Sequence, residues 1–317
     1  MKRHYTAALI LGVAAILSAC GAGGEAKTQE QTKNTVAVLP KDSSAEADTK
    51  DVQEEPVQVK IGVTGAVHEM IWAPAIEKLK KEGIEVELVQ FSDFTLPNNA
   101  LANGELDLNA FQHLLYLDNE KKEHGYEISK IANEYSSHMN LFSDKISSID
   151  ELKPGDVIAI PNDVTNGGAA LKVLRDAGII KLKEDAAFSP TLEDVTENPY
   201  GVEIRELAAN TIPSALPDVA AAIVNINYAL DYGLKMEDAL FVGKLKEEEY
   251  WTLIAARTAD LQDPERVALF DKIIDAIQSD ETKKVYEDTF GGYYEASGWD
   301  EDFLAPYRTQ ATETKAN

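Results

Sequence analysis

Short apolar runs of strand length alternate with amphipathic helical stretches along most of the chain after Val57. The first pair joins residues 59–63 to residues 69–82, where apolar side chains recur at helical spacing before Gly83 ends the helix. Strands that alternate with helices are typical of β-α-β units, in which helices cover a mainly parallel sheet. The pattern therefore predicts an α/β fold.

The alternation divides into two similar sets. The expected strands are residues 59–63, 86–91, 106–111, 157–160, 202–207, 221–225 and 250–255. The expected helices are residues 69–82, 96–103, 112–124, a segment that follows a loop at 161–168 and ends at Gly178, 212–218, and a last helix from Pro264. Two α/β lobes, joined by crossings near residues 131–142 and 250–257, are the economical arrangement. Ligands of open α/β sheets bind beyond the carboxyl ends of the strands, so the site is expected in the cleft between lobes.

The same pattern sets the expected domain boundaries. Residues 58–138 would form the first part of lobe I, and residues 139–248 would form lobe II. Residues 249–317 would supply a return strand and C-terminal helices, mainly to lobe I. Before them, residues 21–57 are small and polar with few large apolar side chains, which predicts a flexible, disordered linker.

The first 20 residues read as an export signal. Lys2 and Arg3 precede an apolar run at residues 7–17, which is shorter than the roughly 20 residues of a membrane-spanning helix. Leu17-Ser18-Ala19-Cys20 then resembles the bacterial lipobox, which implies a lipid on Cys20 as the mature N-terminus. The alternative is an ordinary secretory signal. Cys20 is the one cysteine, which excludes intramolecular disulfides and multi-thiolate metal sites.

Charge and motifs narrow the function. The 317 residues include 55 acidic and 30 basic side chains, a formal charge of −25, which disfavours nucleic acid and anionic lipid headgroups as partners. No G-x-S-x-G, H-E-x-x-H or P-loop motif occurs, and no two of the five histidines have helical metal-ligand spacing. We therefore expect neither an enzyme nor a cofactor, although a metal site built from separated residues stays open.

Two segments after the expected strands carry a specific resemblance. Residues 91–98 read F-S-D-F-T-L-P-N, and residues 109–117 read N-A-F-Q-H-L-L-Y-L. They resemble the F-x-D-Y-x-x-P-N and N-A-F-Q-H-x-x-Y-L patterns of the methionine-binding lipoproteins of bacterial ABC importers, the NlpA-type substrate-binding family. The likeness continues in order through residues 149–152, 160–166, 178–182, 197–199 and 224–228.

This resemblance implies a type II periplasmic-binding-protein fold, with two α/β lobes around a ligand cleft. It also implies a monomer that binds an amino-acid-sized ligand and delivers it to a membrane permease. Phe94, Phe111, His113 and Tyr116 would form an aromatic wall, with the last two on one helical face, and thioethers pack favourably against aromatic rings. The alternative for Phe94 and Phe111 is a core position at a strand end.

Polar ligand contacts are implied at Asn166 and Asn225, because an amide offers a donor and an acceptor to a zwitterion. Asn225 could instead bond a neighbouring backbone group. Asn198 precedes Pro199, so a turn position is the alternative to a ligand contact there.

One position departs from the family pattern. Methionine binders typically read T-N-x-x-R, whereas Thr165 and Asn166 are followed by Gly-Gly and then Ala169. The amides at the start of this helix, Lys172 or Arg175 could replace the missing arginine, although solvated charges on the helix face are the favoured interpretation of both cations. The ligand is therefore expected to be methionine, a related amino acid or a small peptide, or a different small molecule without a carboxylate there.

Two further functions remain open at this point. An enzyme of this fold would need an acid–base pair in the cleft, and His113 with Asp107 or Asp93 is the only candidate. A surface adhesin or signalling lipoprotein would use an exterior patch instead, and it would not depend on Asn225.

Overall fold

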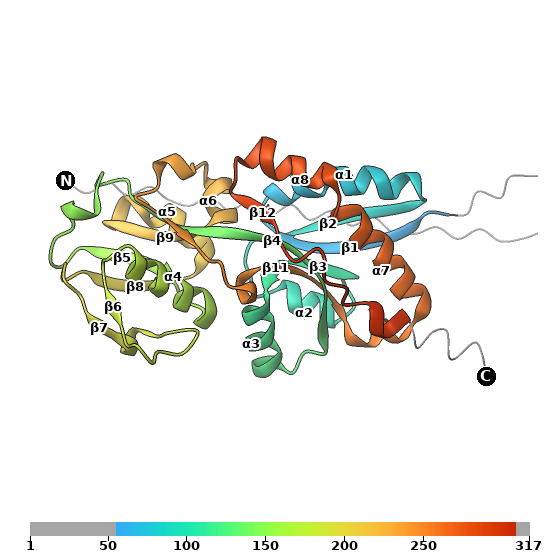
Figure 1. The fold of residues 1–317 in the computed structure, drawn as a ribbon, viewed down its shortest axis with the longest axis horizontal. Helices are drawn as coiled ribbons and strands as arrows, with labels where there is room; N and C mark the ends of the chain where they lie inside the picture. Colours follow the sequence, from blue (N-terminus) through green and yellow to red (C-terminus); the bar gives the residue numbers. More distant parts are fainter. Residues whose placement is uncertain (1–54, 309–317) are drawn as a thin grey trace, which may run out of the picture. The chain divides into compact units, whose positions relative to one another are not determined.

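The computed structural model describes residues 55–308, and the predicted signal peptide, lipobox and most of the linker lie outside this range. A ten-stranded sheet runs through it in the order β2-β1-β3-β11-β4-β9-β5-β8, with β10 and β12 also paired to β4 (Figure 1). Its strands are β1 (Val57–Thr64), β2 (Ile84–Phe91), β3 (Leu108–His113), β4 (Ile128–Phe142), β5 (Val157–Pro161), β8 (Glu203–Leu207), β9 (Ala221–Asn225), β10 (Phe241–Lys244), β11 (Thr252–Arg257) and β12 (Tyr294–Ala296).

The α-helices occupy most of the segments that the periodicity predicts. They are α1 (Val67–Lys81), α2 (Pro97–Ala102), α3 (Leu114–His124), α4 (Val164–Asp176), α5 (Ile212–Ala215), α6 (Ile226–Tyr232), α7 (Pro264–Ile277) and α8 (Asp280–Lys284). The short strands β6 (Lys181–Leu182) and β7 (Val195–Glu197) form a separate pair. This pair, β10 and β12 were not predicted from the sequence pattern. No helix in residues 55–308 is both long and apolar enough to span a bilayer.

Strand β4 belongs to both halves of the sheet. Its 15 residues correspond to roughly 50 Å of extended chain. Residues 128–135 pair with β11, whereas residues 138–142 pair with β9 and β10. We call β1, β2, β3, β11 and the start of β4 the first half, and β5, β8, β9, β10 and the end of β4 the second half.

The sheet is mixed rather than mainly parallel. Strand β1 pairs in parallel with β2 and β3, and β5 pairs in parallel with β8 and β9, as the β-α-β pattern predicts. Strand β11, however, is antiparallel to both β3 and β4. The reason is that β4 carries the chain into the second half and β11 brings it back in the opposite direction.

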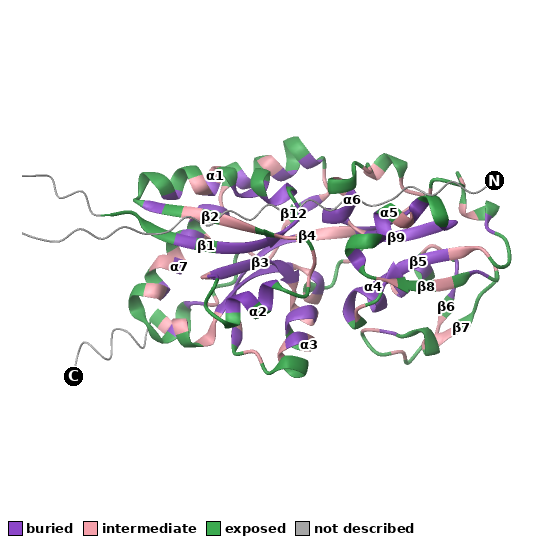
Figure 2. Cartoon of the chain, turned by 180° about the vertical axis from the view of Figure 1, so that it is seen from behind, coloured by how far each residue is buried: buried purple, intermediate pink, exposed green. Residues whose placement is uncertain are grey.

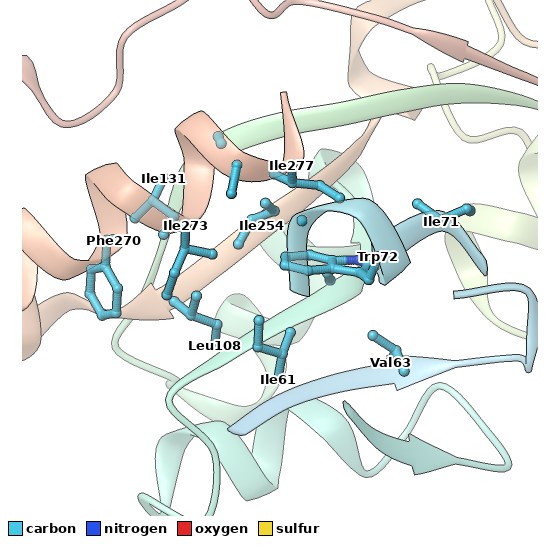
Figure 3. Packing of buried hydrophobic residues seen from close by; sticks show 14 of the residues in the cluster. Ile61, Val63, Ile71, Trp72, Leu108, Ile131, Ile254, Phe270, Ile273 and Ile277 are labelled. Atoms are coloured by element: carbon cyan, nitrogen blue, oxygen red, sulfur yellow. The ribbon is translucent and has the colours of Figure 1, made fainter. Parts of the chain in front are cut away.

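The core of the first half lies between the sheet and two helices. Trp72 and Ile71 on α1 pack with Ile273 and Ile277 on α7 over the apolar side chains of β1, β3, β4 and β11 (Figure 3). Trp72 is fully buried. Strands β1 and β3 are largely buried, while α1 and α7 expose their outer faces (Figure 2). Burial of this apolar face is the main term that fixes both helices on the sheet.

Helix α4 begins five residues earlier than its glycines suggest. Asp163 caps it by accepting a hydrogen bond from the Asn166 N–H at 2.9 Å, so residues 164–168 are helical rather than a loop. Gly167 and Gly168 lower helix propensity, but close packing requires both. A Cβ atom at Gly168 would lie 2.8 Å from the Cα of Ser189, and one at Gly167 would lie 2.9 Å from the Pro161 carbonyl oxygen.

A carboxyl group is buried in the first half where β4 passes beneath α1. Glu134 is 1% exposed, and its Oε1 accepts a hydrogen bond from Trp72 Nε1 at 3.0 Å. Its Oε2 has no partner among the described residues. Desolvation raises the pKa of Glu134 to about 8, although the bond from Trp72 lowers it. Glu134 is therefore protonated in the folded protein at neutral pH.

This carboxyl group makes stability depend on pH. The unfolded chain releases the Glu134 proton above its ordinary pKa, whereas the folded chain keeps it up to pH about 8, so stability falls as pH rises through that window. The slope from one group is at most about 1.4 kcal/mol per pH unit. In Glu134→Gln this contribution is absent. As the pH rises from 5 to 8, the unfolding free energy of the variant should therefore increase relative to that of the wild type. Urea titrations measure it, with exposed Glu127→Gln as the control; parallel pH profiles would contradict the prediction.

Candidate functional site

A cavity that is partly open to solvent lies where the two halves meet. The first half contributes β3, the start of α3 and the segment after β2, and the second half contributes α4, the end of β9 and the start of α6. The middle of β4 forms another side. The lining residues are His68, Phe94, Phe111, Gln112, His113, Tyr116, Tyr135, Ser137, His138, Met139, Asn166, Asn225, Ile226, Asn227, Leu245, Tyr250 and Thr252.

The predicted aromatic residues come together on one wall of the cavity. The ring centroid of Phe94 lies 6.1 Å from that of Phe111 and 6.2 Å from that of Tyr116. Phe111 and Tyr116 meet edge to face at 6.0 Å. The Tyr116 hydroxyl donates to the Phe94 carbonyl oxygen at 2.9 Å, which ties the segment after β2 to α3. Edge-to-face packing of this kind holds the rings in one arrangement.

His113 takes a different position from the predicted helical face. It is the last residue of β3 and caps α3, where its Nδ1 accepts a hydrogen bond from the Tyr116 N–H at 3.2 Å. Nδ1 must then be unprotonated, so the neutral ring carries its proton on Nε2. Nε2 is buried and makes no hydrogen bond of standard geometry within residues 55–308, although the Asn166 side chain is close enough to raise the pKa of the ring. Burial lowers the pKa of His113 to about 4, so the ring is a neutral donor at physiological pH.

On the opposite wall, three side chains form a directed chain of hydrogen bonds. The Asp163 carboxylate accepts from Asn166 Nδ2 at 3.1 Å. Because a carboxylate only accepts, the Asn166 amide is oriented with Oδ1 away from Asp163, where it receives Asn225 Nδ2 at 2.8 Å. Asn225 Oδ1 is then left buried without a partner in the described chain. An acceptor oxygen is thus available for a ligand.

A second cluster of amide side chains, Asn98, Asn109 and Gln112, supports the strand that carries the aromatic wall. Asn98 Nδ2 donates to Gln112 Oε1 at 2.7 Å, and Gln112 Nε2 donates back to Asn98 Oδ1 at 2.7 Å. Asn109 Nδ2 also donates to Asn98 Oδ1, at 2.9 Å. All three side chains are buried. These residues of the P-N and N-A-F-Q segments therefore join α2 to β3 and fix the strand that carries Phe111 and His113.

No charged side chain is present among the cavity residues within the described range. The three histidines do not supply charge either. Burial lowers the pKa of His68 to about 4, and desolvation followed by the charge of Lys244 lowers that of His138. His68 Nδ1 lies 3.2 Å from the Gly65 carbonyl oxygen, which can only accept, so His68 Nε2 accepts from the Tyr135 hydroxyl at 3.1 Å.

Hydrogen bonds and a ring contact join the two halves around the cavity. The Ala66 N–H donates to Asp231 at 3.0 Å, and Asn210 Nδ2 donates to the Ser92 carbonyl oxygen at 3.1 Å. The Phe94 ring also lies 4.9 Å from that of Tyr228. Phe94 is therefore shared between the cavity wall and the packing of the second half.

Two of the positions predicted from the sequence lie elsewhere. Asn198 sits in the turn before β8, where it donates to the Val202 carbonyl oxygen at 2.8 Å and accepts from the Val202 N–H at 3.1 Å. It does not line the cavity. Ala169 is fully buried in the apolar core of the second half, also away from the cavity lining. Cys20 lies outside the described residues.

The two cations considered as replacements for an arginine are already paired. Lys172 is not solvated: its Nζ lies 3.6 Å from the centre of the Phe188 ring and 3.5 Å from Glu247 Oε1. Arg175 is paired with Asp176 at 2.7 Å. The start of α4 carries a carboxylate as well, because Asp163 accepts the Asn166 N–H there.

The acid–base pairs considered for an enzyme do not assemble. Asp107 pairs with Arg266 at 2.7 Å and accepts from the Lys60 N–H. Asp93 accepts from the Thr95 N–H at 2.8 Å and from its hydroxyl. Neither carboxylate is bonded to His113, whose Nδ1 is used by Tyr116.

Sequence reasoning missed the cavity residues that come from β4 and from the segment that leads into β11. They include Ser137, His138, Met139, Leu245, Tyr250 and Thr252. The Tyr250 ring lies 5.4 Å from that of His113, and its buried hydroxyl has no partner within the described chain. The β4 residues could have been found from the predicted crossing at residues 131–142. The middle of a strand that is shared by both halves borders the space between them.

Comparison with known proteins places this geometry in a family. The family model described as NlpA lipoprotein matches residues 59–297. The chain is 42% identical over 245 residues to the "D-methionine-binding lipoprotein MetQ" of Yersinia pestis, covering 76% of this chain and 88% of the relative.

Solved structures agree with this match. A nutrient-binding protein from Burkholderia cenocepacia bound to methionine is 37% identical, with a TM-score of 0.70 over 75% of this chain and 99% of that one. The substrate-binding protein of a methionine transporter from Streptococcus pneumoniae is 33% identical, with a TM-score of 0.71 over 75% of this chain and 95% of that one. The predicted two-lobed periplasmic-binding fold is thereby confirmed, and the chain belongs to the NlpA lipoprotein family.

Proposed function

We propose that this chain is the substrate-binding lipoprotein of an ABC importer, which binds methionine or a related amino acid or small peptide and delivers it to a membrane permease. The observation that carries the proposal is the cavity itself, where ordered aromatic rings face unpartnered polar atoms in a member of this family. The relatives named above are binding proteins, and binding requires no covalent step.

The polar atoms match the two ends of an amino acid. Asn225 Oδ1 is an acceptor suited to an ammonium group, whereas His113 Nε2–H is a donor suited to a carbonyl or carboxylate oxygen. A ligand that satisfies both removes the cost of leaving them buried and unpaired. Phe94, Phe111 and Tyr116 would hold the side chain, and a thioether gains about 0.3–1.5 kcal/mol from aromatic contacts. Asn166 would act by orienting Asn225.

Delivery follows from ligand contacts on both halves. A ligand that touches His113 on one half and Asn225 on the other favours the arrangement in which both are close. A permease that recognises this arrangement would receive loaded protein in preference to empty protein. The lipid on Cys20 would keep the protein at the membrane surface, with residues 21–57 as the tether.

Ligand binding should stabilise the folded chain. A ligand at about 100 times its dissociation constant adds roughly 2.7 kcal/mol to the unfolding free energy. Thermal unfolding with the common amino acids and methionine dipeptides should therefore show a raised midpoint for sulfur-containing compounds. A panel in which none of them shifts the midpoint would remove the substrate assignment.

Replacement of Asn225 should weaken binding more than replacement of an asparagine outside the cavity. In Asn225→Ala the ammonium acceptor is lost, and loss of a hydrogen bond to a charged group costs about 1.5–3 kcal/mol, or roughly 10- to 150-fold in affinity. Asn198→Ala, which alters the turn before β8, is the matched control and should keep wild-type affinity. Calorimetry with the responding amino acid decides, and equal losses in both variants would contradict the site.

Lipid anchoring through Cys20 predicts a change in phase behaviour. The processed wild-type protein should enter the detergent phase of a Triton X-114 extract, because acyl chains supply its only membrane affinity in this proposal. Cys20→Ser should remain in the aqueous phase. Detergent partitioning of the variant equal to that of the wild type would show that the cysteine is not the anchor.

A further inference from the structure

Among the described residues, the cavity offers no cationic side chain that could pair with a ligand carboxylate. No lysine or arginine lines it in the described part of the chain, and its histidines are neutral. A buried carboxylate without a cationic partner is costly, so neutral donors such as His113 Nε2–H suit an uncharged carbonyl better than an anion.

The start of helix α4 reinforces this preference. A free helix N-terminus attracts anions, but here Asp163 occupies it and accepts both the Asn166 N–H and the Thr165 hydroxyl. The negative charge therefore lies on the side of the cavity where a carboxylate would otherwise be held. Burial has the largest effect on the pKa of both His113 and Tyr116, and the charge of Asp163 raises the pKa of each.

Two lysines that interact with lining side chains do not line the cavity themselves. Lys172 lies behind Tyr250, 5.1 Å from the ring centre, and is paired with Glu247. Lys244 lies at the exposed end of β10, and its charge adds to desolvation in lowering the pKa of His138. Neither lines the cavity.

The same arrangement favours a cation at Asn225. Its Oδ1 is the terminal acceptor of the chain that begins at the Asp163 carboxylate, so Asp163 places negative potential behind it. An ammonium group at this oxygen gains both the hydrogen bond and the attraction of the nearby charge.

We propose that the natural ligand presents a free ammonium group to Asn225 and an amide carbonyl, not a carboxylate, to His113, as does the N-terminal residue of a short peptide. This inference rests on the proposed function and specifies the class of ligand. The sulfur-containing or similarly apolar side chain of that residue packs against the aromatic wall.

Space for the rest of such a peptide adjoins the cavity. A neighbouring pocket shares Ser137, His138 and Leu245 with it, so these side chains lie between the two pockets. This second pocket is also lined by two lysines, Lys244 and Lys246, and by one carboxylate, Glu295. The carboxylate of a peptide that extends past His138 would meet these lysines.

The test compares head groups on one side chain. Purified protein is unfolded and refolded to release bound material, then titrated by calorimetry with L-methionine, L-methioninamide, L-methionylglycine, glycyl-L-methionine and N-acetyl-L-methioninamide. The amide and methionylglycine should bind at least 10-fold more tightly than methionine and glycylmethionine. The N-acetyl amide lacks the ammonium group, so it should lose at least 10-fold against the amide. The pair norleucine and norleucinamide repeats the comparison without sulfur.

The outcomes separate this inference from the proposed function. If methionine binds as tightly as methioninamide, or glycylmethionine as tightly as methionylglycine, the inference is wrong while the assignment as a binding protein stands. If none of these compounds binds, the proposed function fails. The Lys244→Gln variant should bind methionylglycine more weakly than the wild type does, but it should bind methioninamide equally well. If the variant and the wild type bind methionylglycine with equal affinity, Lys244 is not part of the peptide site.

Discussion

The hydrogen bond from Asn225 to Asn166 determines what the cavity can bind. It joins β9 to the first turn of α4, and the Asp163 carboxylate behind it fixes the direction of both amides. An amide that could flip would offer either a donor or an acceptor, but here only the acceptor oxygen of Asn225 remains unpaired. The opposite wall is fixed in the same way, because the Tyr116 N–H holds the proton of His113 on Nε2. In the proposed function, binding specificity thus depends on the groups that orient Asn225 and His113 as well as on these two side chains themselves.

The shared strand explains why these two walls face one another. Strand β4 is part of both halves, and β11 returns beside it, so two antiparallel strands connect halves whose other strands are parallel. Each half supports its own wall: the buried amides of Asn98, Asn109 and Gln112 support the aromatic side, and the packing of Gly168 against Ser189 positions α4. The cavity therefore joins two separately packed units through β4, and small rotations about this strand would open or close it.

The sequence predicted the parts of this structure that depend on local patterns. The β-α-β alternation located most strands and helices because each buries one apolar face. The family segments located Phe94, Phe111, Tyr116 and Asn225, all of which line the cavity.

Other features could not be predicted from these patterns. The glycines after Asn166 indicated a loop, but packing against Pro161 and Ser189 makes them helical. His113 was expected on a helix face and instead caps the helix. Lys172 looked like a solvated charge, yet the ring of Phe188 from a distant loop covers it. Asn198 shares its residue type with the site and serves a turn. Gly168 and Lys172 are decided by Ser189 and Phe188 on another segment of the chain. His113 and Asn198 instead bond Tyr116 and Val202 a few residues away, and their residue types alone do not reveal a cap or a turn.

The central claim is that this cavity holds a small molecule between an aromatic wall and an oriented amide. Mass spectrometry of the material released when natively purified protein is denatured tests it most directly. The account predicts one dominant small molecule with an amino group and an amino-acid-sized side chain, which is absent from protein carrying Asn225→Ala. Release of no such molecule, or the same molecule in equal amount from the variant, would contradict it.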